Sequence, residues 1–315
     1  MITLLSRDTI RSLMRLLLLI VLGLVPAIAS AQKLDTKPRT AVMTAFPPEW
    51  GALVGAVSEP VEHRLNGLLI LTGTMQGKPV VLMQSGVSMV NAAMNTQLLL
   101  DRFTVKRIVF SGIAGGVDPG LDIGDVVAPE RWNQYMEVSL ARKTASGWTP
   151  PERQDADALP NYGMMFPRAV RVGNASEPAT RHRWFNADAG LLAVARQVAD
   201  KAPLDRCIPA SLPARCLAYA PKVVVGGGGV SGTAFADNAE YREYLFSTLK
   251  ANVLDMESAA VAHVAYANSV PFIVFRSLSD LAGGDADANQ ETTFMTLASV
   301  NSASVVRTFV EALPD

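Results

Sequence analysis

Residues 252–264 read NVLDMESAAVAHV, and this stretch contains both halves of a strand-to-helix unit. The apolar run NVL ends at Asp255, and the small apolar residues after Glu257 have the composition of a buried helix. In sheets of parallel strands, ligands bind beyond the carboxyl ends of the strands. Asp255 and Glu257 are therefore predicted to lie where the core gives way to a pocket.

The same pattern recurs along the chain and predicts the fold class. Short apolar runs stop abruptly at polar or glycine residues, and helical segments follow several of them. The runs are TAVMTAF (40–46), PVVLM (79–83), RIVF (107–110), KVVV (222–225) and PFIVF (271–275). Such an alternation indicates an α/β fold whose mainly parallel sheet is covered on both faces. We expect Glu49, the SGIAGG loop after RIVF, Glu257 and Asp280 to meet at one rim.

Two further helices and one irregular stretch complete the predicted organisation. Asn186 can cap a helix with an apolar stripe from Leu191 to Val198, and the last helix carries a stripe from Phe294 to Phe309. Between about 138 and 184 the chain gathers prolines and polar residues without a sustained period, which is typical of a long loop excursion. We predict a single domain over residues 38–315 that includes this excursion.

The first 31 residues have the features of an export signal. Three arginines precede the apolar run LLLLIVLGLV (16–25), and Ala29-Ser30-Ala31 provides a small-x-small cleavage site. Ten apolar residues fall well short of the ~20 that a membrane-spanning helix needs. We expect cleavage near Ala31, with Met14 as an alternative start, and a periplasmic or secreted protein without a membrane anchor.

Composition and cysteine usage limit the classes of function. The chain is 49% hydrophobic and 18% charged with a net charge of −1, so it is globular and has no basic face for nucleic acid. Its two cysteines, Cys207 and Cys216, flank a proline-rich loop, and in an exported chain a disulfide between them is favoured. A nucleophile or a metal pair is less favoured, because the three histidines are scattered and no CxxC or HExxH pattern occurs.

Three acids at the predicted rim are candidates for chemistry. Asp280 follows an apolar strand and is either an N-cap or a partly buried general acid, which Ser279 would orient. Glu257 is either a helix-start acid or a ligand for two vicinal hydroxyls, and Glu49 is either a turn acid or a base that deprotonates water. Without a metal cluster, three such acids favour bond cleavage through a cation-like transition state.

From about Thr40 onward the chain resembles the nucleoside phosphorylase and nucleosidase superfamily, most closely 5′-methylthioadenosine/S-adenosylhomocysteine nucleosidase. The matching stretches, in order, are TAFPPEW, QSGVSMVNAAMNTQLLL, FSGIAGGVDPGLDIGDVVAP, FNADAGLL, VSGTAF, LDMESAAVAHVA and VPFIVFRSLSD. The resemblance implies a three-layer α/β/α domain with a mixed, mainly parallel central sheet. It also implies a homodimer that works without a metal or organic cofactor.

The resemblance further implies roles for individual residues. Asp280 is similar to the acid that protonates purine N7, and Glu49 to the carboxylate that activates the attacking water. Glu257 is similar to the ligand of the ribose hydroxyls, with Met256 near the sugar, and Phe235 to the aromatic that stacks on the base. The remaining residues implied to line the substrate site are Val87, Gly112 and Ile113.

The same comparison favours hydrolysis over phosphorolysis. Phosphorylases of this superfamily place an arginine just before the glycine-rich stretch, where this chain has Phe110, and phosphate without cationic partners would bind poorly. The expected reaction releases adenine from methylthioadenosine, S-adenosylhomocysteine or a related purine nucleoside. A phosphorylase and an exported nucleoside-binding or storage protein remain as alternatives, the latter because Ile113 stands where nucleosidases tend to carry a small hydroxyl residue.

Overall fold

The computed structural model describes residues 32–151, 157–208 and 213–314, so the predicted export signal lies outside the described residues. One sheet of 12 strands forms the centre of the molecule, and nine of them follow the order β14-β7-β16-β17-β5-β1-β4-β3-β2. β6, β15 and β18 join this sheet beside β5. The strands are β1 (Asp35–Thr44), β2 (Ser58–Leu65), β3 (Leu68–Met75), β4 (Lys78–Gln84), β5 (Phe103–Gly116), β6 (Val126–Ala128), β7 (Arg131–Gln134), β14 (Phe185–Asn186), β15 (Val223–Val225), β16 (Gly228–Ser231), β17 (Ala251–Asp255) and β18 (Phe272–Asp280).

The sheet is mixed and mainly parallel, as predicted. β5 runs parallel to both β1 and β18, and β16 runs parallel to both β7 and β17. Antiparallel pairing occurs along the β2-β3-β4 edge and between β17 and β5. The carboxyl ends of β1 and β18 therefore point the same way as that of β5, while β17 enters the junction from the opposite direction.

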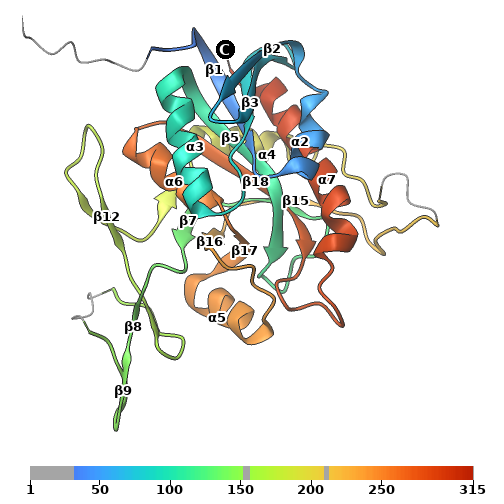
Figure 1. Ribbon diagram of the computed structural model, residues 1–315. Helices are drawn as coiled ribbons and strands as arrows, with labels where there is room; N and C mark the ends of the chain where they lie inside the picture. The colour runs from blue at the N-terminus through green and yellow to red at the C-terminus, as the bar shows by residue number, and fades with distance from the viewer. Residues whose placement is uncertain (1–31, 152–156, 209–212, 315) are drawn as a thin grey trace, which may run out of the picture.

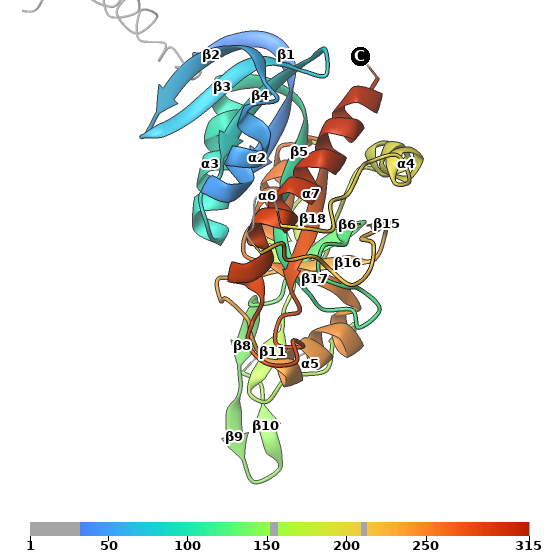
Figure 2. The same cartoon turned by 90° about the vertical axis from the view of Figure 1, so that its right-hand side faces the viewer.

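Helices cover both faces of the sheet and give the predicted three layers. α3 packs against α6 on one side, whereas α7 packs against β18, β5, α2 and α4 on the other. Figures 1 and 2 show these two groups separated by the central strands. The helices are α2 (Pro47–Val54), α3 (Met89–Arg102), α4 (Ala189–Val198), α5 (Ala239–Leu249), α6 (Ser258–Ala267) and α7 (Glu291–Ala312).

The hydrophobic core forms where the apolar runs of the sequence become central strands. Residues 41–43 of β1, 108–110 of β5 and 272–275 of β18 are all buried. A strand that is covered on both faces buries every side chain, which explains why these runs are continuous rather than alternating. The fold thus places the ends of three buried strands at one rim.

The glycine-rich stretches differ from the prediction. RIVF was expected to stop at SGIAGG, but β5 continues through Gly116 and pairs with β18 along most of its length. A Cβ atom at Gly115 would lie 3.0 Å from Ala282, and one at Gly116 would lie 2.9 Å from Leu278. These glycines therefore allow strands to approach closely instead of forming a turn, and β16 likewise begins inside GGGG.

The cap of α4 also differs from the prediction. Asn186 belongs to β14, and the cap is Asp188, whose side chain accepts a hydrogen bond from the Leu191 N–H at 2.9 Å. Both residue types cap helices well, so composition alone did not distinguish them. The expected apolar stripe is present, because Leu191, Ala195 and Val198 are buried.

The 138–184 stretch, predicted as a long loop, contains three small two-stranded sheets and projects from the body (Figures 1 and 2). Tyr162 packs against Tyr241 and Tyr244 of α5, and the Tyr244 hydroxyl donates to the Pro160 carbonyl at 2.7 Å. These contacts hold the segment against α5. The strand pairs are β8 (Val138–Leu140) with β11 (Met165–Pro167), β9 (Arg142–Thr144) with β10 (Gly147–Thr149), and β12 (Val170–Val172) with β13 (Thr180–His182).

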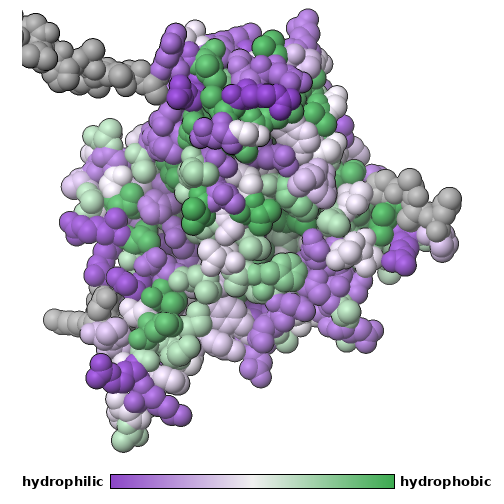
Figure 3. Space-filling model, viewed as in Figure 1, coloured by the Kyte–Doolittle hydropathy of each residue, from purple (hydrophilic) through white to green (hydrophobic). Residues whose placement is uncertain are grey.

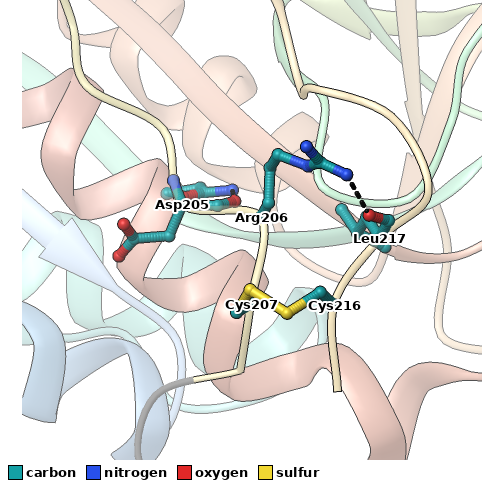
Figure 4. Close-up of a disulfide and its surroundings, with 6 residues drawn as sticks. Asp205, Arg206, Cys207, Cys216 and Leu217 are labelled. Carbon is teal, nitrogen blue, oxygen red and sulfur yellow. Dashed lines mark hydrogen bonds between the residues drawn. A yellow bond between two sulfur atoms is a disulfide. The ribbon is translucent and has the colours of Figure 1, made fainter. Parts of the chain in front are cut away.

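A disulfide joins Cys207 and Cys216, the pair that the sequence favoured (Figure 4). The two arms of this loop are also paired through backbone hydrogen bonds, and Arg206 donates to the Leu217 carbonyl at 2.8 Å. Leu217 packs with Leu297 of α7. The disulfide therefore closes a loop that packs against the last helix.

Candidate active site

The three predicted acids line one cavity. Glu49 lies in the first turn of α2, Glu257 precedes α6, and Asp280 is the last residue of β18. The cavity has a volume of about 240 Å³, and five other predicted site residues also line it: Val87, Ile113, Phe235, Met256 and Ser279. Segments more than 230 residues apart in sequence thus converge at the rim expected for this fold.

Arg276 lies behind the acids, and sequence reasoning missed it. Its side chain is fully buried within β18. Nε lies 2.7 Å from Asp255 Oδ2, Nη1 lies 3.5 Å from Glu49 Oε1, and Nη2 lies 3.5 Å from Glu257 Oε2. Arginine is almost never fully buried unless it is paired. An arginine directly after an apolar strand, in a chain with three acids expected at the same rim, was the signal that could have identified it.

Asp255, the last residue of β17, has a structural role that differs from that of Glu257. Its carboxylate accepts hydrogen bonds from the hydroxyls of Ser231 and Ser258 and from the N–H groups of Glu257 and Ser258, besides pairing with Arg276. Asp255 therefore caps α6 and holds the guanidinium. Because Asp255 performs the capping, the side chain of Glu257 is not needed for it.

Glu257 faces the cavity from a buried position. Its Oε1 accepts a hydrogen bond from the Ser88 N–H at 2.8 Å. Burial raises the pKa of Glu257 to about 7; Arg276 opposes this shift, while the negative charges of Asp255 and Glu49 add to it. A carboxylate near its pKa at neutral pH can both accept hydrogen bonds from hydroxyls and exchange a proton.

Glu49 is the most enclosed of the three predicted acids, with only 2% of its surface exposed. Oε1 accepts from the Ile113 N–H at 2.9 Å, and Oε2 accepts from the Ala45 N–H at 2.5 Å. Burial raises its pKa, and Arg276 together with these two N–H groups opposes the shift. This acid is therefore held in one orientation in a poorly hydrated site, where its basicity is increased.

Asp280 is held separately from the Arg276 cluster. Its carboxylate accepts from the Ser279 hydroxyl and the Ala282 N–H, both at 2.9 Å, and from the Asn289 amide at 3.3 Å. Burial raises the pKa of Asp280 above its usual range. Ser279 thus orients Asp280 as expected from the sequence, and the environment favours the protonated form that a general acid requires.

Gly112 does not line the cavity but lies directly behind it. A Cβ atom at this position would stand 1.8 Å from Arg276 Nη1 and 2.5 Å from Glu49 Oε1. Phe110 lies two residues earlier on β5, and the centre of its ring is 4.3 Å from the guanidinium carbon of Arg276. The absence of a side chain at Gly112 therefore makes room for the buried ion pair.

The charge of the cavity walls is negative or neutral. None of the described residues that line it is a lysine, arginine or histidine. Over residues 32–151, 157–208 and 213–314, no group of three or more histidine, cysteine or acidic side chains is arranged to hold a metal ion. In the same part of the chain, no helix is both long enough and apolar enough to cross a membrane.

Comparisons with known proteins agree with this fold. A family model described as "Phosphorylase superfamily" matches residues 39–311, and the chain therefore belongs to that superfamily. It is similar to the 5′-methylthioadenosine/S-adenosylhomocysteine nucleosidase of Actinobacillus succinogenes, at 29% identity over 84% of this chain and 95% of that protein. The enzyme of the same name from Staphylococcus aureus is 28% identical over 83% of this chain and 99% of its own length.

Solved structures share the fold. The nucleosidase of the same name from S. pneumoniae, in complex with a transition-state inhibitor, matches with a TM-score of 0.64 and 24% identity, covering 88% of this chain and 100% of that one. The futalosine hydrolase of Helicobacter pylori strain 26695 matches with a TM-score of 0.64 and 21% identity, covering 88% of this chain and 98% of that one. At these identities the structural likeness concerns the fold.

The raised pKa of Glu257 predicts a pH dependence of stability. The pKa of this glutamate is 4.5 in the unfolded chain and about 7 in the native protein. At a pH between these two values, the native protein keeps a proton on Glu257 that the unfolded chain has released. This contribution is therefore full below pH 4.5 and is lost as the pH rises to about 7. The side chain of Glu257→Gln cannot titrate. Between pH 4.5 and 7 we therefore expect the free energy of unfolding to fall by roughly 3 kcal/mol more in the wild type than in Glu257→Gln.

Urea unfolding at several pH values between 4.5 and 7 measures this difference. Glu240→Gln is the matched control, because Glu240 is exposed and lies outside the cavity. The control should follow the wild-type curve. Identical pH slopes for the wild type and Glu257→Gln would contradict the assignment of a raised pKa to Glu257.

Proposed function

We propose that this protein is a purine nucleosidase that hydrolyses the N-glycosidic bond and releases adenine from methylthioadenosine, S-adenosylhomocysteine or a related nucleoside. The observation that carries the proposal is the convergence of Asp280, Glu257 and Glu49 on one cavity without a basic wall residue. The similarity to nucleosidases along most of the chain also supports it. The reaction requires neither a metal nor an organic cofactor.

The proposed mechanism assigns one step to each acid. Asp280 donates its proton to N7 of the purine, so that the electrons of the glycosidic bond move into the departing base. Glu257 accepts hydrogen bonds from the two ribose hydroxyls and, when ionised, stabilises positive charge that develops on the sugar. Water attacks C1′ of the sugar and gives a proton to Glu49, whose raised pKa makes it a stronger base.

The position of Arg276 favours water over phosphate as the attacking group. Phosphate is best bound by arginine or lysine side chains that present free N–H groups. The guanidinium of Arg276 is fully buried and faces three carboxylates, so it neutralises the site instead of offering a place for an anion. Phe110, which occupies the position of the phosphorylase arginine, supports the guanidinium from one side.

Ile113 contributes to the site through its backbone. Its N–H donates to Glu49 and its carbonyl accepts from Arg276 Nη1 at 3.4 Å, while its side chain lines the cavity. The apolar side chain supplies no hydroxyl for the water, so Glu49 is the residue that orients it. This difference from other nucleosidases is also the observation that keeps a non-catalytic binding protein as the second candidate.

Incubation with a panel of nucleosides tests the proposal directly. The mature protein is mixed with methylthioadenosine, S-adenosylhomocysteine, adenosine or inosine, with and without phosphate, and free base is measured by chromatography. We expect adenine release at a rate that phosphate does not change. A requirement for phosphate, with ribose 1-phosphate as product, would indicate a phosphorylase. Tight adenosine binding with unchanged ligand after hours would indicate a binding protein.

Asp280→Asn separates catalysis from binding. The amide keeps the shape of the side chain but cannot donate the acidic proton, so we expect cleavage to fall ~10²-fold or more while nucleoside affinity largely survives. Asp237→Asn is the matched control, because Asp237 is exposed and contacts the same Asn289 amide. Wild-type activity in Asp280→Asn would show that another group protonates the base.

We also propose that the protein is exported. Support comes from the leader-like sequence of residues 1–31 and from the Cys207–Cys216 disulfide, since disulfides persist mainly in oxidising compartments. Mass spectrometry of the protein from its native cell should find an N-terminus at Gln32 and no free thiol. An intact leader on the mature protein would contradict export.

A homodimer is the proposed assembly. Large apolar side chains remain exposed beside and along α3 and at the base of the projecting segment, on the face that Figure 3 shows. They are Val87, Val90 and Met94 in the first group and Met136, Leu140 and Met164 in the second. A second copy of the chain would bury them next to the cavity, which Val87 lines.

Sedimentation equilibrium tests the proposed homodimer and should give twice the mass of one chain. A monomer at micromolar concentration would contradict the proposal.

A further inference from the structure

Besides the three proposed catalytic acids and Asp255, a fifth acid, Glu291, lines the cavity and has no part in the proposed mechanism. Glu291 is the first residue of α7, and its side chain shares the cavity wall with Glu49, Glu257 and Asp280. Cavity walls that hold a nucleoside are mostly apolar, with a few polar groups that fix orientation. A carboxylate in such a wall therefore calls for a ligand group that matches it.

The contacts of Glu291 leave most of its hydrogen-bonding capacity open. Its N–H donates to Asn289 Oδ1 at 2.9 Å, whereas its carboxylate contacts the Thr292 hydroxyl at 3.3 Å. Within the described part of the chain, no lysine, arginine or histidine forms an ion pair with it. An ionised carboxylate offers about four acceptor positions, so this half-buried group can accept hydrogen bonds from a ligand.

The position of Glu291 indicates which part of the ligand it faces. α7 packs against α2, and its first residue lines the same cavity as Phe46 and Glu49 of the α2 region. If the base contacts Asp280 and Phe235, and the ribose hydroxyls contact Glu257, the substituent on the 5′ carbon is the remaining part of the nucleoside. From the cavity lining, we assign Ala45, Phe46, Val87 and Glu291 to this substituent.

The chemistry of that wall discriminates between 5′ substituents. A hydroxyl or an ammonium group donates a hydrogen bond to a carboxylate, whereas a methylthio group has no donor and would leave the carboxylate partly desolvated and unpaired. Sites built to hydrogen-bond a ligand reject the analogue that lacks the donor. The three apolar neighbours alone would not make this distinction.

We infer that Glu291 is a specificity-determining residue that favours nucleosides with a hydrogen-bond donor on the 5′ side, either a hydroxyl or an ammonium group, over those with a purely apolar 5′ group. This inference rests on the proposed nucleosidase function and narrows its substrate class. Glu291 accepts the donor's hydrogen bond and takes no proton in the reaction.

Paired substrates test the inference. Adenosine and 5′-deoxyadenosine differ only in the 5′ hydroxyl, and S-adenosylhomocysteine and methylthioadenosine differ in a chain that ends in an ammonium and a carboxylate. We expect the wild type to prefer adenosine to 5′-deoxyadenosine by about tenfold or more in kcat/KM, Glu291→Leu to abolish that preference, and Glu291→Gln to keep part of it. The second pair shows whether an ammonium group is recognised in the same way.

Glu240→Leu is the matched control, because Glu240 is likewise an acid in the first turn of a helix but lies outside the cavity. It should keep the wild-type ratio. Ratios in both pairs that Glu291→Leu leaves unchanged would overturn the inference while leaving the nucleosidase function intact. If no nucleoside is cleaved, the proposed function fails. Calorimetry then tests the role of Glu291 separately, by comparing the ratio of dissociation constants within each pair between the wild type and Glu291→Leu.

Discussion

The buried guanidinium of Arg276 is the constraint on which the site depends. A fully buried charge is tolerated only when hydrogen-bonded partners surround it, and here Glu49, Asp255 and Glu257 come from three separate elements. The pairing fixes the starts of α2 and α6 and the end of β17 relative to β18. It also explains why residue 112 is a glycine, since any side chain there would occupy the position of the guanidinium.

The same cluster separates the roles of the acids. Arg276 opposes the effect of burial on the pKa values of Glu49 and Glu257 and so favours the ionised form of both groups. Among the described residues, no basic side chain pairs with Asp280, so burial favours its protonated form. Acidic groups whose environments differ in this way can serve as acid and base in one site.

The sequence was sufficient to predict the parallel sheet and the convergence of Glu49, Glu257 and Asp280, because apolar runs that stop at acids mark the ends of buried strands. It was not sufficient for Arg276 or for the course of β5 through SGIAGG. In both cases the reason lies in the pairing of the two strands. A charged residue and a glycine run each look like the end of a strand, but here Gly112 of β5 pairs with Arg276 of β18 and leaves room for its guanidinium. The strand pairs within 138–184 escaped prediction because strands of three residues carry no measurable period.

The measurement that tests this account most directly is the activity and urea stability of Arg276→Met between pH 5 and 8, with Arg196→Met, at an exposed position of α4, as the control. Without the guanidinium, three carboxylates remain buried together, so the free energy of unfolding at neutral pH should fall by about 3–5 kcal/mol and recover partly as the pH falls. Nucleoside cleavage should be lost at pH 7, because the pKa values of Glu49 and Glu257 rise further. An Arg276→Met protein as stable and as active at pH 7 as the control would contradict the claim that this buried charge organises the site.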